Sequence, residues 1–150
     1  MDSRIPDVIT ALVGLGKTDP ELEGVAVADG PEVSDTAAMD WLVVGFDGDP
    51  SGDFEAAQSI AEFSGLGTRR EEQFQVTVAA ICNRGDVDIV AARRRAYEIG
   101  ARVVAWLQAS PSLGLAELEA GVAATRLVQD QTDQGASVRL LLTVAGRGFI

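Results

Sequence analysis

Residues 73–110, QFQVTVAAICNRGDVDIVAARRRAYEIGARVVAWLQAS, carry the clearest secondary-structure pattern in the chain. In the first ten of these residues, one set of alternate positions is apolar throughout: Phe74, Val76, Val78, Ala80 and Cys82. A repeat of two is typical of a β-strand that buries one face. Asn83-Arg84-Gly85 ends this pattern, so we expect a strand over residues 73–82 and a different element after it.

That next element is predicted to be a long helix, capped by Asp86 and ended by Pro111. Its apolar residues recur every three or four positions, which places them on one face: Ile89, Ala92, Ala96, Ile99, Val103 and Trp106. We therefore expect Trp106 to be a core residue, together with Cys82 of the strand and Trp41 of a second strand.

The rest of the chain supplies elements on both sides of this strand and helix. Gly14 and Gly16 are expected to end an N-terminal helix, and Gly65-Leu66-Gly67 to break a short one. The predicted elements are a helix over residues 5–15, strands over 24–28 and 41–46, a short helix over 54–63, and strands over 122–130 and 137–145 joined by a five-residue loop. Residues 47–71 are predicted to be the longest irregular stretch, an acidic loop.

This order of elements predicts an α+β fold: one domain over residues 1–150, with a mostly antiparallel sheet of five strands. We expect the long helix and the N-terminal helix to pack on one face of the sheet. A chain of 150 residues with 47% apolar residues can bury a core without disulfides or metals.

Composition excludes several classes of function. The chain has no histidine and a single cysteine, which removes His-containing catalytic pairs and zinc sites, internal disulfides and thiolate cages. Its net charge of −11 argues against binding to DNA by counterion release. We find no signal peptide and no apolar run long enough to span a bilayer. Composition therefore disfavours an enzyme.

Charge is distributed unevenly along the chain. Residues 1–67 carry two basic and fourteen acidic side chains, a net −12, whereas residues 68–150 carry ten arginines and nine acidic side chains, a net +1. Either the chain has an acidic fringe, or its two parts meet different partners.

Residues 11–18, ALVGLGKT, fit a relaxed phosphate-loop pattern. A phosphate loop needs a strand before it and a helix that starts at the lysine. Here the preceding segment is predicted to be helical, and Pro20 and Gly24 leave no room for a helix after Lys17. We expect a helix C-terminus and no nucleotide binding.

The segment Asp47-Gly-Asp-Pro-Ser-Gly-Asp-Phe-Glu55 resembles a calcium-binding loop, with Asp47, Asp49, Ser51 and Asp53 as candidate ligands. The position that needs a bidentate glutamate is Gln58, a poor ligand. A solvated acidic turn is the simpler interpretation, and we predict no metal site. An acid/base pair of carboxylates is a further alternative, for which nothing in the sequence indicates a buried partner.

Two charged groups are candidate interface residues. The first comprises Asp47, Asp49, Asp53 and Glu55, and the second comprises Arg93, Arg94 and Arg95 on the long helix. The arginines could form a solvated face, bind phosphate or pair with acidic residues of a neighbouring subunit. The carboxylates could face such a neighbour or line a channel.

Several features together resemble tail terminator proteins of long-tailed bacteriophages, also called minor tail or tail completion proteins. The resemblance covers nearly the whole chain and rests on layout, because none of its motifs is catalytic. The stretches that carry it are IPDVITAL at the start of the first helix, WLVVGFDGD from residue 41, REEQFQVTV from residue 70, AARRRAY from residue 91, and RLVQDQTDQG and SVRLLLTV of the terminal hairpin.

The resemblance implies a structural role in the virion. Such proteins form a hexameric ring at the head-proximal end of the tail tube, stop its growth and join it to the head connector. The implied partners are further copies of this chain, the tail tube protein and the head–tail connector protein, while double-stranded DNA passes through the lumen unbound. The implied location is the virion tail, assembled in the host bacterial cytoplasm, with no catalytic residues and no cofactors.

Other functions are weighed beside this one. A neck or tail tube protein belongs to the same class. A small calcium-binding or ligand-binding module, or an enzyme that uses carboxylates alone, belongs to a different class.

Overall fold

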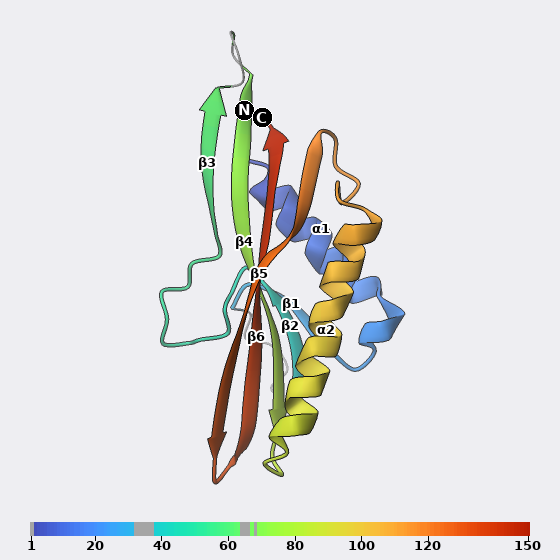
Figure 1. Ribbon diagram of the computed structural model, residues 1–150, viewed down its shortest axis with the longest axis vertical. Coiled ribbons are helices and arrows are strands. Elements are labelled where there is room, and N and C mark those ends of the chain that lie inside the picture. The colour runs from blue at the N-terminus through green and yellow to red at the C-terminus, as the bar shows by residue number, and fades with distance from the viewer. Residues whose placement is uncertain (1, 32–37, 64–66, 68) are drawn as a thin grey trace.

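A computed structural model of the chain describes residues 2–31, 38–63, 67 and 69–150 (Figure 1). Its elements are α1 (Ile5–Thr18), the short 3-10 helix η1 (Pro20–Leu22), β1 (Ala26–Asp29), β2 (Asp40–Val44), β3 (Ala57–Phe63), β4 (Arg70–Arg84), α2 (Ile89–Ala109), β5 (Leu118–Thr132) and β6 (Gly135–Phe149). The predicted α+β class with a mostly antiparallel sheet is confirmed.

The strands form one sheet in the order β1-β2-β4-β6-β5, in which only the β1–β2 pair is parallel. The long strand β4 has two partners on the same side. Residues 70–76 of β4 pair with β3, and residues 78–82 pair with β2. One half of the sheet is therefore β3-β4-β6-β5, and β3 continues the sheet edge beyond the end of β2 (Figure 1).

Both helices lie over one face of the sheet. Leu42 of β2 is paired with Ala80 of β4, which is paired with Leu140 of β6, so these three side chains point the same way. Gly16 of α1 lies against the Leu42 side chain, and Gly100 of α2 lies against Leu140. A Cβ at Gly100 would come within 2.8 Å of Leu140 Cδ2, so glycine allows α2 to approach the sheet closely.

The core fills the space between this face and the helices. Trp106 of α2 and Cys82 of β4 are both buried in it, as predicted, whereas Trp41 is only half-buried. Burial, with a smaller contribution from the nearby Asp40 carboxylate, raises the pKa of the Cys82 thiol to about 12. Cys82 therefore behaves as a small core side chain.

The prediction for residues 54–63 was wrong, because Ala57–Phe63 is the strand β3. The segment has small residues at helical spacing, but backbone pairing with β4 from Arg70 to Val76 determines its conformation. Tertiary pairing overrides weak local preference. The sheet consequently gains a sixth strand, and residues 57–63 and 70–71 of the expected irregular stretch 47–71 belong to the paired strands β3 and β4. The predicted break at Gly65-Leu66-Gly67 lies largely outside the described residues.

The ends of α1, α2, β5 and β6 also differ from prediction. Gly14 and Gly16 do not end α1, which continues to Thr18, because Gly16 packs against the sheet within the helix. Asp88, and not Asp86, caps α2 by accepting a hydrogen bond from Ala91 N. The β5–β6 strands are longer than expected, and only residues 133–134 separate them.

Candidate assembly surface

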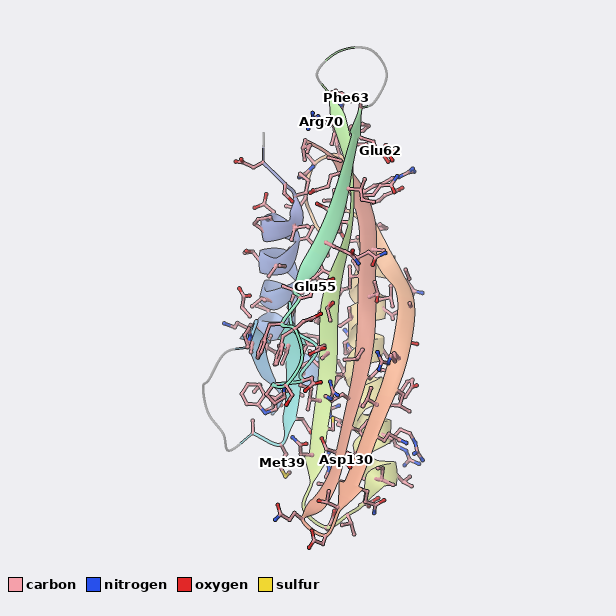
Figure 2. The ribbon with its side chains drawn as sticks, turned by 90° about the vertical axis from the view of Figure 1, so that its left-hand side faces the viewer. Met39, Glu55, Glu62, Phe63, Arg70 and Asp130 are labelled. Carbon is pink, nitrogen blue, oxygen red and sulfur yellow. The ribbon has the colours of Figure 1, made fainter. Side chains whose placement is uncertain are left out.

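The face of the sheet opposite the helices is here called the bare face. Its central side chains alternate with the core residues of β4 and β6, and include Gln75, Thr77, Arg139 and Thr143. Figure 2 looks onto this face, with α2 behind the strands. Among the described residues, no helix covers it.

The acidic loop, redefined by the structure as residues 47–55, lies over the bare face. Arg139 Nη1 donates a hydrogen bond of 2.7 Å to the Asp47 carbonyl oxygen. Gly48, at φ +81°, sits so close to Ile81 that a Cβ there would come within 2.7 Å of Ile81 Cδ1. Because Ile81 and Arg139 are directly paired and point away from the core, these contacts place the loop on the bare face.

The carboxylates of the acidic loop shape its turns. Asp47 accepts a hydrogen bond from Asp49 N, Asp49 from Ser51 N and Asp53 from Glu55 N, at 2.8–3.0 Å. These bonds to the backbone two residues ahead are Asx turns. The part of the chain that the structure describes contains no group of three or more acidic, cysteine or histidine side chains placed to hold a metal ion. The geometry does not favour the calcium-binding alternative.

Two aromatic rings anchor the acidic loop. Phe54 stacks on Phe46 with ring centroids 5.4 Å apart, while its backbone adopts φ +59°, unusual for a bulky residue. A hollow of about 490 Å³ separates the loop from Arg126 of β5 and has Thr77 and Thr143 in its lining. The loop is therefore held in place with carboxylates and an arginine around an open polar hollow.

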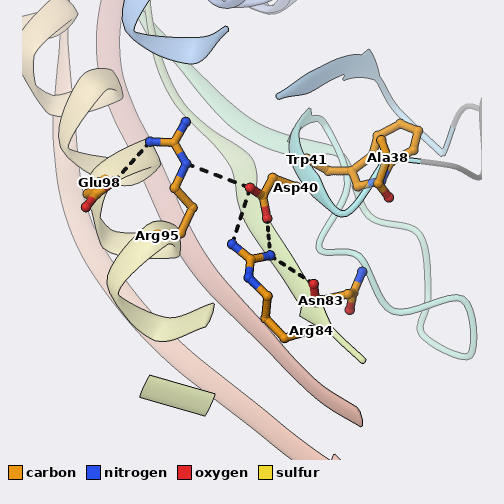
Figure 3. Close-up of polar contacts among 7 residues, drawn as sticks. All are labelled: Ala38, Asp40, Trp41, Asn83, Arg84, Arg95 and Glu98. Carbon is orange, nitrogen blue, oxygen red and sulfur yellow. Dashed lines mark hydrogen bonds and ion pairs between the residues drawn. The ribbon is translucent and has the colours of Figure 1, made fainter. Parts of the chain in front are cut away.

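The three arginines of α2 have different environments. Arg95 lies 3.8 Å from Asp40 and 3.0 Å from Glu98, and Asp40 also pairs with Arg84 (Figure 3). Arg93 donates a hydrogen bond to Gln129 of β5. Arg94 is exposed, with no ion pair to any described residue. Two of the three arginines, Arg93 and Arg95, therefore have partners within the subunit.

The predicted acidic and basic interface groups are not brought together. The acidic loop lies on the bare face, whereas α2 lies over the opposite, covered face. The sheet separates the two groups within one subunit.

The phosphate-loop resemblance has no structural counterpart. Residues 11–18 are helical throughout, and Lys17 occupies the last turn of α1 instead of the first turn of a helix. The amide groups of this segment lie inside a helix and do not form a cradle for phosphate.

Asp19 joins the end of α1 to α2, a contact that was not predicted from the sequence. Its Oδ2 accepts hydrogen bonds from Arg102 Nε at 2.8 Å and Trp106 Nε1 at 2.7 Å, and its side chain is only 3% exposed. Burial acts to raise the pKa of Asp19, but hydrogen bonds from Arg102, Glu21 N and Trp106, with the charge of Arg102, outweigh it. The net effect lowers the pKa below its ordinary value.

The exposure of β3 was not predicted from the sequence. All residues from Gln58 to Phe63 are exposed, and Ile60 at 65% and Phe63 at 67% are the most exposed large hydrophobic residues described. Within the described residues, β3 pairs only with β4 and β5 pairs only with β6. Each therefore leaves one edge free. An exposed apolar edge strand is a template for pairing with another chain.

The two free edges lie at the same level of the sheet. Across the four strands, Ala61 is paired with Glu72, Glu72 with Gly148, and Gly148 with Leu118. Ala61 and Leu118 therefore lie at the same level. Ala57 is aligned in the same way with Val122. β3 and β5 run antiparallel to each other, so β3 of one copy and β5 of another have the directions needed for antiparallel pairing.

The orientation of the β3 backbone identifies the groups at its free edge. Thr77 N donates a hydrogen bond of 3.0 Å to Ala56 O. Hydrogen-bonded positions alternate along antiparallel strands, so the amides of Gln58, Ile60 and Glu62 face β4. The amides of Ser59 and Ala61 then face outward at the free edge.

No protein-family model and no curated protein matches the chain. In the described ranges, neither helix is long and apolar enough to cross a membrane.

Proposed function

We propose that this chain is a ring-forming structural subunit of a phage tail, acting as the tail terminator. The observation that carries the proposal is the pair of free edges, on β3 and β5, at one level on opposite sides of a four-stranded sheet. Joining unlike edges gives a head-to-tail contact, and such contacts close into rings when the rotation between copies permits.

The bare face supports a role around a DNA channel. In a ring built edge to edge, one face of the sheet turns inward, and the helices suit the outer side. The bare face would then line the lumen with polar side chains and the acidic loop. Carboxylates repel a duplex that carries one negative charge per ~1.7 Å, so DNA would pass without adhering.

The resemblance of the sequence to tail terminators supplies the finer assignment. It implies six copies on the head-proximal end of the tube, where the ring stops tube growth and meets the head connector. This role requires protein surfaces and no reaction centre. A tail tube protein would use the same two edges to build a tube. The test must therefore distinguish a chain that stops tube growth from one that forms the tube itself.

Electron microscopy and a tube-growth assay test the assignment together. We expect the purified chain to form closed rings of about six times 15.7 kDa, or roughly 94 kDa. Added to a polymerising tail tube protein, it should shorten the tubes and be seen at one end. Long tubes made of this chain alone would show a tube protein instead, and a monomer that leaves tube length unchanged would refute the proposal.

A further inference from the structure

The outer edge of β5 is fully open over only its second half. In the first half, the Ala120 amide points away from β6 and donates a hydrogen bond of 2.8 Å to Pro111 O, so the segment that joins α2 to β5 occupies part of the edge. A bulge between Val122 and Ala124 ends this half. Beyond the bulge, residues 125–131 take part in no backbone hydrogen bond with any described loop or turn. This second half is therefore the part of β5 that another strand can join.

The backbone of the second half presents its hydrogen-bonding groups in the required order. Phe149 N donates a hydrogen bond to Glu117 O, so the odd-numbered residues of β6 face β5. Their partners beyond the bulge are the even-numbered residues of β5, which face β6. Odd-numbered residues such as Leu127 therefore direct their amides outward, as Ala61 does on β3. Both side chains lie on the covered face, so pairing these two residues keeps the faces of two copies continuous.

A strand added to β3 would meet β1 if it continued far enough. β2 and β3 pair with the same edge of β4, and β1 pairs with the far side of β2. β1 therefore occupies the strand position just outside β3, beginning with Asp29 at the level of Val78. If two copies joined at equal levels, with Leu118 opposite Ala61, the second half of β5 would run into β1 of the next copy. The copies must therefore be staggered along the strands.

One register satisfies both limits. With Leu127 of one copy opposite Ala61 of the next, residues 125–131 of β5 pair with all seven residues of β3. Thr132 is then level with Thr77 of the next copy, one position before β1 begins. Closing a sheet into a ring requires a stagger of this kind, because the strands tilt against the ring axis.

The side chains of the bare face are complementary in this register. Ile60, an exposed apolar residue of β3, lies opposite Val128, and Glu62 lies opposite Arg126. Neither Glu62 nor Arg126 forms an ion pair with any described residue. Within the subunit Glu62 is directly paired with Glu71, and like charges in this position are unfavourable. A cation on the other side of Glu62 would offset that repulsion.

Neighbouring registers fit less well. The register can change only in steps of two residues, because outward-facing positions alternate. Two residues in one direction bring the end of β5 to the level of β1, and two residues in the other place Ile60 opposite Asp130. Both changes also separate Glu62 from Arg126.

We propose that β3 of one copy pairs with residues 125–131 of β5 of the next copy, with Ile60 opposite Val128 and Glu62 opposite Arg126. This inference rests on the proposed ring and specifies its subunit boundary. The occupant of the β3 edge is a second copy of this chain, because β5 offers the matching strand direction, apolar residue and charge.

Disulfide trapping tests the register. Residues between the hydrogen-bonded positions of an antiparallel pair have Cα atoms about 4.5 Å apart, which suits a disulfide. Ile60→Cys/Val128→Cys would place two thiols at such a pair. Within one chain, β3 and β5 are separated by three strand spacings, about 14 Å, beyond the ~7 Å limit for a disulfide, so a crosslink must join two copies. The native Cys82 is buried and its pKa is raised to about 12, so it is a poor thiolate donor.

We expect the oxidised double variant to give a ladder of covalent oligomers that ends at the closed ring, whereas each single variant should give dimers at most. Ile60→Cys/Glu119→Cys is the matched control, because Glu119 would face Ile60 if copies joined at equal levels. A chain that assembles only on the tail tube is oxidised there, with the same readout. A ring without a ladder above the control, or a ladder from the control alone, would overturn the register and leave the ring intact. A wild-type chain that neither forms rings nor shortens tubes would overturn the proposed function as well.

Charge reversal gives an independent test of the ion pair. Arg126→Glu should raise the concentration needed for half-assembly on the order of tenfold. The substitution also adds a negative charge beside the acidic loop, so Glu62→Arg/Arg126→Glu is needed to isolate the pair, and it should restore much of the loss. Arg94→Glu, on the exposed side of α2, is the control and should assemble like wild type. Equal assembly of Arg126→Glu and Arg94→Glu would contradict the pairing, and so would a double variant that is no better than Arg126→Glu.

Discussion

The covered and bare faces of the sheet come from the same strands but differ in what they do. Along β4 and β6, alternate residues enter the core under the helices. Their neighbours on the bare face are mixed: Gln75, Thr77, Arg139 and Thr143 are polar, and Ala79, Ile81 and Leu141 are apolar. The covered face stabilises the subunit by burying apolar surface. The bare face and its free edges contribute little to subunit stability and offer polar groups to other molecules. Stability and assembly are therefore expected to respond to different substitutions.

The largest effect on stability is expected from Trp106→Ala on the covered face. The substitution removes a buried aromatic side chain and one hydrogen bond to Asp19, and should lower the free energy of unfolding by about 3–5 kcal/mol. Urea unfolding at neutral pH measures the change. Tyr97→Ala, on the exposed side of the same helix, is the control. A melting temperature within a degree or two of wild type would contradict the assigned role of Trp106.

A smaller loss of stability is expected from Asp19→Asn. Removing the charge weakens its bonds with Arg102 and Trp106 and should cost about 2 kcal/mol near pH 7. The folded-state pKa of Asp19 is lowered, so its contribution is present above the unfolded pKa and is lost as pH falls through the lowered value. The difference in the free energy of unfolding between wild type and Asp19→Asn should shrink in acid. Urea unfolding from pH 7 to pH 3 measures this difference. A constant or widening difference would contradict this sign.

On the bare face, Asp47→Asn, Asp49→Asn and Asp53→Asn together should change subunit stability by less than about 0.5 kcal/mol. Asparagine preserves the Asx turns while removing three charges. With the loop on the lumen side, rings should assemble normally and phage carrying the variant should eject DNA more slowly. Failed assembly would instead place these carboxylates at a subunit boundary, and no change in either would show a merely solvated loop.

The smallest effect is expected from Lys17→Ala. Lys17 lies on α1 and belongs to neither face of the sheet. Lys17 is in the last turn of a helix and faces no phosphate cradle. Calorimetry should detect no binding of ATP to wild type or variant, and both should unfold alike. Micromolar binding that Lys17→Ala abolishes would restore the nucleotide hypothesis.

The contrast between the faces also explains how much could be predicted from sequence. The covered face follows from the alternation in residues 73–82 and the spacing of Ile89 to Trp106, because burial leaves a periodic apolar pattern. β3 leaves no such pattern: six of its seven residues are exposed, so burial does not impose a regular alternation of apolar and polar residues, and the spacing of its small residues also fits a helix. Its pairing with β4 depends on backbone hydrogen bonds, which do not require particular side chains.

The candidate surface was predictable only in part. The acidic loop and the arginines of α2 are visible as charges in the sequence, but the position of the loop on the bare face depends on Arg139 and Ile81, which contact Asp47 and Gly48 of the loop. The ion pair of Asp40 with Arg84 and the bonds of Asp19 likewise join residues distant in sequence. Such contacts follow from topology and have no local sequence signal.

Ala61→Pro tests whether copies of the chain assemble through the free edges. The Ala61 amide faces outward from β3, so proline removes a donor at the free edge and leaves the hydrogen bonds of Ile60 and Glu62 to β4 in place. Ala61→Val keeps the amide and is the control. Light scattering should report about 94 kDa for wild type and Ala61→Val, and 15.7 kDa for Ala61→Pro with near-native unfolding. A full-size ring of Ala61→Pro would contradict the account, and so would a wild-type monomer that leaves the length of growing tail tubes unchanged.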